Sequence, residues 1–126
     1  METRTRMLNR AAEIWQRTLN STADQRLELA HELADMEIFS HRQIAKIARM
    51  STTTLGRKVE NRGSGGGRFE PSTLSALAVI REMVIDNKPL PMALIQATVK
   101  DGTSLSNLCR LTGAPRASLY NRIKED

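Results

Sequence analysis

One pattern of small and apolar residues occurs twice in this 126-residue sequence, and the repeat limits the folds that the chain can adopt. Residues 44–59 align with residues 108–123 at a constant offset of 64 positions, and small or apolar residues occupy both members of each aligned core pair. The aligned pairs are Ile44 and Leu108, Ala45 and Cys109, Ile47 and Leu111, Met50 and Ala114, Leu55 and Leu119, and Val59 and Ile123. Such a repeat indicates one supersecondary unit that is used twice.

The composition and the spacing of apolar residues predict an all-α fold. Hydrophobic residues make up 40% of the chain but aromatic residues only 3%, a mixture that favours helices over strands. Apolar residues recur at three- and four-residue steps in each predicted helix. The predicted helices cover residues 3–19 and 23–36, two short segments after Ser40 and Ser51, a segment after Pro71, residues 92–101, and two short segments within residues 103–124.

Helix ends and buried faces follow from the same patterns. A capping box opens the second helix, formed either by Ser21 with Asp24 or by Thr22 with Gln25. Ser40 and Ser72 are predicted N-caps of later helices. The apolar stripe of the first helix is expected to include Leu19, and Ile85 is expected to face the core.

The stretch "ENRGSGGGRFEP" interrupts the helical pattern near the midpoint. It lacks the Lys-Ser/Thr of a phosphate-binding loop and follows a predicted helix instead of a strand, so nucleotide binding is not expected. A flexible Gly-rich linker is therefore predicted at residues 62–71. It would join an N-terminal helix-turn-helix domain, residues 1–61, to a C-terminal helix-turn-helix domain, residues 72–126.

The positive charge is concentrated in the two repeated segments. The whole chain carries +5, residues 40–62 carry +5 and residues 103–124 carry +4, so all other residues together carry −4. Positive charge gathered on particular elements is typical of proteins that bind a polyanion such as DNA.

The spacing within each copy is that of a helix-turn-helix. A small residue in the first helix lets the second helix approach closely, a turn residue follows four positions later, and a helix-starting residue comes two positions after the turn. These residues are Ala45, Arg49 and Ser51 in the first copy, and Cys109, Gly113 and Pro115 in the second.

A family resemblance rests on these two stretches. "LSNLCRLTGAPRASLYNRI" is similar to the C-terminal DNA-binding segment of serine recombinases and resolvases, and "HRQIAKIARMSTTTLGRKV" resembles homeodomain-like helix-turn-helix proteins, among them small phage and bacterial repressors. The resemblance covers about 40 of the 126 residues. Two positions depart from the pattern: Arg49 replaces the usual turn glycine, and Pro115 replaces a capping hydroxyl. Nothing in the chain resembles the catalytic domain of a recombinase.

The resemblance implies which side chains face the DNA. Thr53 and Arg57 in the first copy, and Ala117 and Asn121 in the second, occupy the groove-facing positions. Arg57 suits guanine, Asn121 suits adenine, and the Ala117 methyl suits a thymine methyl. The remaining candidate DNA-binding residues are Ser51, Thr52, Lys58, Arg116, Tyr120 and Arg122, with Arg62 and Arg68 of the linker as possible minor-groove contacts.

We expect from these observations a sequence-specific double-stranded DNA-binding protein, a repressor of the phage-immunity type that acts by occupying its operator. The two unlike recognition faces predict an asymmetric, bipartite site bound by a monomer or weak dimer, in the cytoplasm of a bacterial host. Alternatives are a DNA-packaging or recombination accessory protein similar to a small terminase subunit, a helical protein-interaction adaptor, and a fragment-like transposase or recombinase.

Other function classes find no support in the residues. No catalytic set can be argued from spacing, so an enzyme is not expected, nor a cofactor, a metal or a small-molecule ligand. His31 and His41 lack partners at metal-ligand spacing. The single cysteine, Cys109, fits a reducing compartment. No apolar run approaches the length of a membrane span, and the first residues are too polar for a secretory signal.

Overall fold

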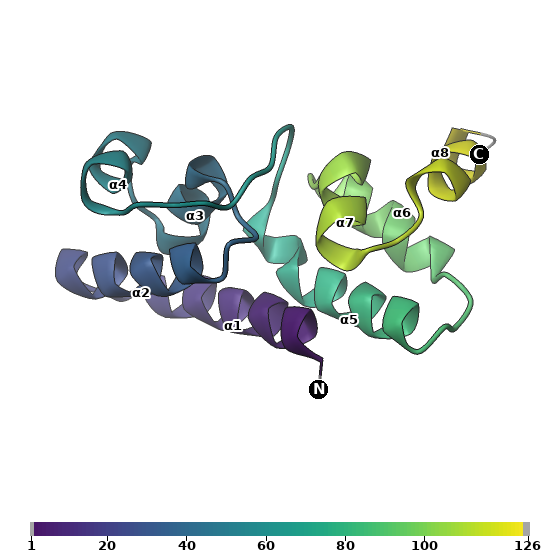
Figure 1. Ribbon diagram of the computed structural model, residues 1–126, viewed down its shortest axis with the longest axis horizontal. Coiled ribbons are helices and arrows are strands. Elements are labelled where there is room, and N and C mark those ends of the chain that lie inside the picture. The colour runs from purple at the N-terminus through teal and green to yellow at the C-terminus, as the bar shows by residue number, and fades with distance from the viewer. Residues whose placement is uncertain (1, 125–126) are drawn as a thin grey trace. The chain divides into compact units, whose positions relative to one another are not determined.

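The computed structural model describes residues 2–124, and these residues form helices and connecting segments without a strand (Figure 1). The predicted all-α class is confirmed. No described helix is both long and apolar enough to cross a membrane. The elements are α1 (Thr3–Thr18), α2 (Ala23–Asp35), α3 (His41–Ala48), α4 (Thr52–Lys58), the 3-10 helix η1 (Pro71–Thr73), α5 (Leu74–Ile85), α6 (Met92–Lys100), α7 (Leu105–Thr112) and α8 (Arg116–Lys124).

The helices group into two compact units. The first unit is Arg10–Gly65, and the second unit combines the described residues up to Asn9 with those from Gly66 onward. The division in the middle of the chain falls within the glycine-rich stretch. Residues 2–9, however, group with the second unit, whereas the sequence pattern placed them in the domain 1–61. The reason is a set of contacts made by the first turns of α1, which are described below.

In the first unit, α3 packs against both α2 and α4. Each of the first two connections ends in a capping box: Thr22 with Gln25 opens α2, and Ser40 with Gln43 opens α3. Of the two alternatives for α2, the structure therefore selects Thr22. Ser21 donates its hydroxyl to the Arg17 carbonyl instead, at 2.8 Å. The fully buried large side chains of this unit are Ile14, Leu33, Phe39, Ile44, Ile47 and Leu55.

In the second unit, α5 packs against α6 and α7, and α7 contacts α8. The predicted N-cap at Ser72 is wrong, because α5 is preceded by η1 and makes no side-chain cap bond. Pro71 starts η1, and Thr73 uses its hydroxyl to bond the Glu70 carbonyl at 2.7 Å. The fully buried large side chains around α5 and α7 include Leu74, Leu77, Ile80, Ile95 and Leu108.

Two residues expected in the core lie on the surface instead. Leu19 is 58% exposed and Ile85 is 45% exposed. Leu19 lies just beyond the end of α1, and the inward position there belongs to Thr18, whose buried hydroxyl donates to the Ile47 carbonyl at 2.9 Å. Ile85 is the last residue of α5. In both cases the helical period was extended into a residue where the helix ends.

The glycine-rich stretch is anchored at both ends, and the flexible linker expected at residues 62–71 stays a prediction for the residues between the two anchors. On one side, Asn61 Nδ2 donates to the Phe39 carbonyl at 2.8 Å, and Gly63 lies so close to the Phe39 backbone that a Cβ would clash with it. On the other side, the Arg68 carbonyl accepts hydrogen bonds from the Ser104 N–H at 2.9 Å and from the Asn107 amide at 2.8 Å. Each anchor lies within one unit.

Candidate nucleic-acid interface

The helix pairs α3–α4 and α7–α8 share the same local construction. Ser40 and Ser104 lie 64 positions apart and cap α3 and α7 in the same way. The hydroxyl of each serine accepts a hydrogen bond from the backbone N–H three residues later, at 3.3 Å in both pairs. Those later residues, Gln43 and Asn107, are both buried amides. The repeat therefore begins four positions earlier than the apolar pattern alone indicated, and a serine followed by an amide three residues later was its signal.

The core positions of the two pairs are also equivalent. Ala45 and Cys109 are buried where the second helix packs, and Leu55 and Leu119 are fully buried beneath α4 and α8. Burial raises the pKa of the Cys109 thiol, which suits a packing residue and not a nucleophile. One face of each second helix is thus held against the first helix, and the remaining faces are left to solvent.

The turn between the helices has a left-handed residue in both pairs. Arg49 has φ 57° and ψ 47°, and Gly113 has φ 78° and ψ 10°. Each donates its N–H to a carbonyl four residues earlier, Ala45 in the first pair and Cys109 in the second. The arginine departure from the family pattern therefore leaves the turn conformation intact.

The side chain of Arg49 gains contacts that offset its unfavourable backbone. Its Nη2 and Nε donate to the Trp15 carbonyl at 3.1 and 3.3 Å, and the guanidinium lies 5.1 Å from the centre of the Trp15 ring. Arg26 adds bonds to the Thr18 carbonyl at 3.0 Å and to the Arg49 carbonyl at 3.4 Å. The end of α1 and the end of α3 are thereby joined beside the turn.

Every predicted DNA-contacting residue is exposed. Ser51 caps α4 by accepting the Thr54 N–H at 3.1 Å, and Arg116 lies over the ring of Tyr120 at 5.1 Å from its centre. Exposure makes these side chains available to a partner but does not identify one. The exposed set is Ser51, Thr52, Thr53, Arg57 and Lys58 at α4, Arg116, Ala117, Tyr120, Asn121 and Arg122 on α8, and Arg62 and Arg68 beside the glycines.

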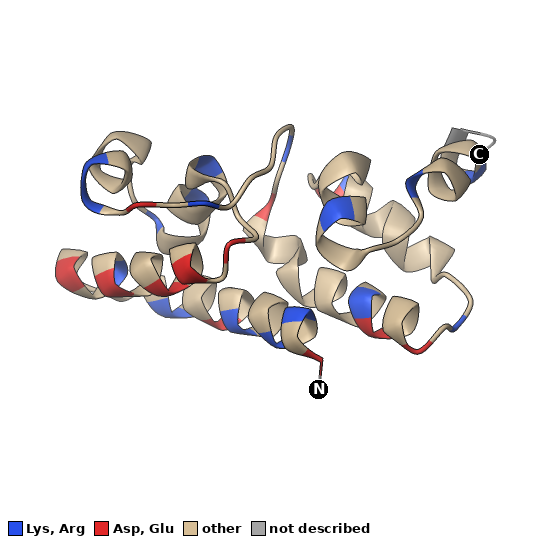
Figure 2. Cartoon of the chain, viewed as in Figure 1, with Lys and Arg blue, Asp and Glu red and all other residues tan. Residues whose placement is uncertain are grey.

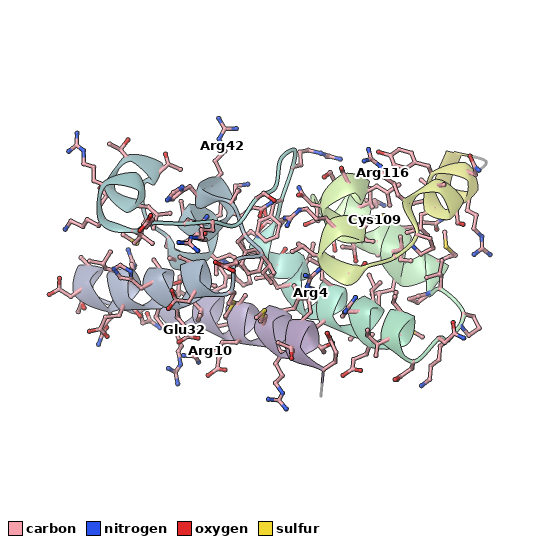
Figure 3. All side chains as sticks on the ribbon, viewed as in Figure 1. Arg4, Arg10, Glu32, Arg42, Cys109 and Arg116 are labelled. Atoms are coloured by element: carbon pink, nitrogen blue, oxygen red, sulfur yellow. The ribbon has the colours of Figure 1, made fainter. Side chains whose placement is uncertain are left out.

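Two further basic residues were missed as candidates. Arg42 and Lys46 are exposed one helical turn apart on α3, and Figure 3 shows the Arg42 side chain extending away from the ribbon. Both contribute to the charge of residues 40–62. Their four-residue spacing on a short amphipathic helix was the signal that could have placed them on one solvent-facing side.

Acidic residues of the first unit lie mainly on a different helix. Figure 2 shows them along α2, whereas α3 and α4 carry basic residues. Glu32 of α2 pairs with Arg10 of α1, and this hydrogen-bonded pairing lowers the pKa of the Glu32 carboxyl. The net positive charge of this unit therefore lies mainly on the α3–α4 pair, because the basic residues of α1 and α2 are balanced by acidic neighbours.

The histidines and cysteine form no metal site. Among the described residues no group of three His, Cys, Asp or Glu side chains could hold a metal ion. His41 Nε2 lies 3.0 Å from the carbonyl of Val59, the residue that follows α4, so the His41 side chain contacts the backbone at the end of that helix. His31 is exposed on α2.

Comparisons of this chain with protein-family models, with curated proteins and with solved structures found no match.

Proposed function

We propose that the chain is a sequence-specific double-stranded DNA-binding protein in which α3–α4 and α7–α8 are two helix-turn-helix modules. The observation that carries the proposal is that each pair combines a left-handed turn, one buried leucine under the second helix, and a second helix whose candidate base-contacting side chains are all exposed. In proteins built this way the second helix enters the major groove and the first helix crosses the phosphate backbone.

The exposed side chains supply different chemistry to the two parts of the site. Arg57 on α4 offers two parallel donors to guanine O6 and N7. Asn121 on α8 offers a donor and an acceptor to adenine, and Ala117 one turn earlier offers a methyl group to thymine. A bipartite, asymmetric DNA site follows, because the two modules carry unlike recognition residues.

Around these positions, basic side chains neutralise phosphates and hydroxyl side chains donate hydrogen bonds to them, and neither contact selects sequence. On the first module these are Thr52 and Lys58, with Arg42 and Lys46 on α3; on the second they are Arg116 and Arg122. Arg62 and Arg68 flank the glycines, where a basic segment can enter the minor groove. A repressor that acts by covering its operator requires nothing beyond this binding.

Selection of bound duplexes from a random DNA pool tests the proposal. The expected site has two unlike parts, and Arg57→Ala should relax one part while Asn121→Ala relaxes the other, each at a cost of about 1–3 kcal/mol. Affinity should fall steeply as salt rises, and Arg42→Ala should lower the salt slope by about one unit without changing the selected sequence.

Arg17→Ala is the matched control. Arg17 is an exposed arginine on α1 outside both helix pairs, and its loss changes the net charge as Arg57→Ala does. It should leave sequence preference unchanged. Failure of the wild-type protein to retard any duplex at low salt would contradict the proposal, as would equal losses for Arg57→Ala on all sequences.

A further inference from the structure

The last turn of α7 is held by two arginines from distant parts of the second unit. Arg4 Nη1 donates to the Arg110 carbonyl at 3.1 Å, and Arg81 Nη1 donates to the Thr112 carbonyl at 3.0 Å. Carbonyls in the last turn of a helix have no partner within the helix. The two guanidinium groups satisfy them immediately before the chain turns toward α8.

Arg81 is itself held from both sides. Its Nη2 and Nε donate to the two carboxylate oxygens of Glu2 at 3.1 and 3.2 Å, and both side chains are mostly buried. Glu2 also accepts hydrogen bonds from the Thr5 N–H at 3.0 Å and from the Thr5 hydroxyl at 3.2 Å. A two-point arginine–carboxylate pair has a defined geometry, so the guanidinium has little freedom to leave the Thr112 carbonyl.

The turn residue Gly113 leaves the space that the Arg81 guanidinium occupies. A Cβ on Gly113 would lie 2.5 Å from Arg81 Nη1, and Gly113 already has φ 78°. The absence of a side chain at position 113 therefore has two consequences: the backbone can adopt the left-handed conformation, and the Arg81 guanidinium has space beside the turn.

The α8 helix has few other anchors. Of its side chains that the structure describes, only Leu119 is buried, and Ile123 is half-buried. One buried leucine fixes the distance between α8 and α7 but leaves rotation about that contact. The direction of α8 must then come largely from residues 113–115, which connect it to α7.

We propose that Arg81, held in place by Glu2, is a positioning residue that sets the direction of α8 by fixing the turn after α7. The inference rests on the proposed function for its consequence: α8 presents Ala117 and Asn121 to the second part of the DNA site only in that direction. Neither Glu2 nor Arg81 contacts the DNA; they act through Thr112 and Gly113.

The first test uses the free protein and needs no DNA. Amide hydrogen exchange and amide chemical shifts of residues 113, 114 and 116–118 are compared in wild type, Arg81→Met, Arg81→Lys and Glu2→Gln. The Gly113 N–H donates to the Cys109 carbonyl at 2.8 Å and the Ala114 N–H to the Thr112 hydroxyl at 3.3 Å, so both report on the turn. Arg81→Met should reduce their protection roughly tenfold. Arg81→Lys, which cannot form the two-point pair, should recover only part of it.

The controls are Arg10→Met and Glu32→Gln. Arg10 and Glu32 form an ion pair within the first unit, and each change alters net charge as its counterpart does. The amides of residues 113, 114 and 116–118 should be unaffected in both. If circular dichroism shows that Arg81→Met has lost helix content, the test relies on Glu2→Gln. This variant keeps the Arg81 guanidinium and removes only the carboxylate that holds it. Unchanged exchange and chemical shifts at the amides of residues 113, 114 and 116–118, in Glu2→Gln and in a folded Arg81→Met, would overturn the proposal.

The second test measures DNA affinity with the selected duplex altered in one part at a time. Glu2→Gln and Arg81→Met should each weaken DNA binding roughly tenfold. Base changes in the second part of the DNA site should matter less to these variants than to wild type, whereas base changes in the first part should matter as much. The double variant should be no worse than Arg81→Met, because the two residues act as one unit. Equal losses in the controls, or losses in the first part, would overturn the positioning role. If wild type binds no duplex, the proposed function fails, and the amide measurements alone still decide whether Arg81 sets the direction of α8.

Discussion

The turns after α3 and after α7 have the same left-handed backbone but are stabilised in different ways. In the first, Arg49 accepts an unfavourable backbone conformation and its side chain reaches the Trp15 carbonyl. In the second, Gly113 adopts the conformation freely, and Arg81 from α5 occupies the space that a side chain would need. Both turns thus have a guanidinium beside them, although only one is part of the repeated segment.

The comparison shows one way in which a non-glycine residue stands at this turn: its long side chain makes contacts that offset the cost of the backbone conformation. A left-handed residue other than glycine costs about 1–2 kcal/mol. Hydrogen bonds from a charged donor are worth about 1.5–3 kcal/mol each when well placed. Arg49 can therefore stand where glycine is usual, while an alanine at the same position would carry the cost without the gain.

Of the changes at the two turns, Gly113→Ala should have the largest effect on the unfolding free energy. The new Cβ meets Arg81 and the backbone must stay left-handed, so we expect the second unit to lose about 2–3 kcal/mol of unfolding free energy. Urea denaturation followed by circular dichroism measures this, and Trp15, the single tryptophan, reports on the first unit by fluorescence. Gly56→Ala is the control, because a Cβ there meets nothing within 4 Å. Equal stability of Gly113→Ala and wild type would show that the second turn tolerates a side chain as the first does.

Arg49→Ala and Arg49→Gly separate the two contributions at the first turn. Both lose the hydrogen bonds to Trp15, but only alanine keeps the backbone strain. Arg49→Ala should lower the unfolding free energy by about 1–2 kcal/mol, and Arg49→Gly should be about 1 kcal/mol more stable than Arg49→Ala. Urea midpoints followed by circular dichroism test the order. A glycine variant less stable than the alanine variant would mean that strain plays no part at this turn.

Acid should weaken the Glu2–Arg81 pair beside the second turn, and we expect this to be the smallest of the stability effects. Hydrogen bonding to Arg81 lowers the pKa of Glu2 from 4.5 to about 2. A lowered carboxyl pKa stabilises the fold above pH of about 4.5, and this contribution is lost as pH falls toward about 2. The urea midpoint of wild type should therefore fall between pH 5 and pH 3 by more than that of Glu2→Gln. If the urea midpoints of the two proteins fell equally between pH 5 and pH 3, the stabilising role of ionised Glu2 would be contradicted.

Much of the local structure could be predicted because caps and apolar spacing act within one helix. Ser40 and Ser51 start helices where the residue order predicts them, and Thr22 is one of the two caps that it allowed for α2. The exposure of Arg57 and Asn121 follows from the buried leucine two residues before each. The predictions at Ser72, Leu19 and Ile85 were wrong because helical periodicity carries no information about where a helix ends or whether a 3-10 turn precedes it.

By itself the sequence determined the all-helical class and the exposure of the basic side chains next to the buried leucines, since each depends on residues a few positions apart. Only the tertiary structure decided which arginine reaches which carbonyl. Arg81 meets Thr112 across 31 positions, and Arg4 meets Arg110 across 106. Contacts of that kind leave no periodic trace along the chain, because any exposed arginine satisfies the same pattern until packing brings one of them to the end of α7.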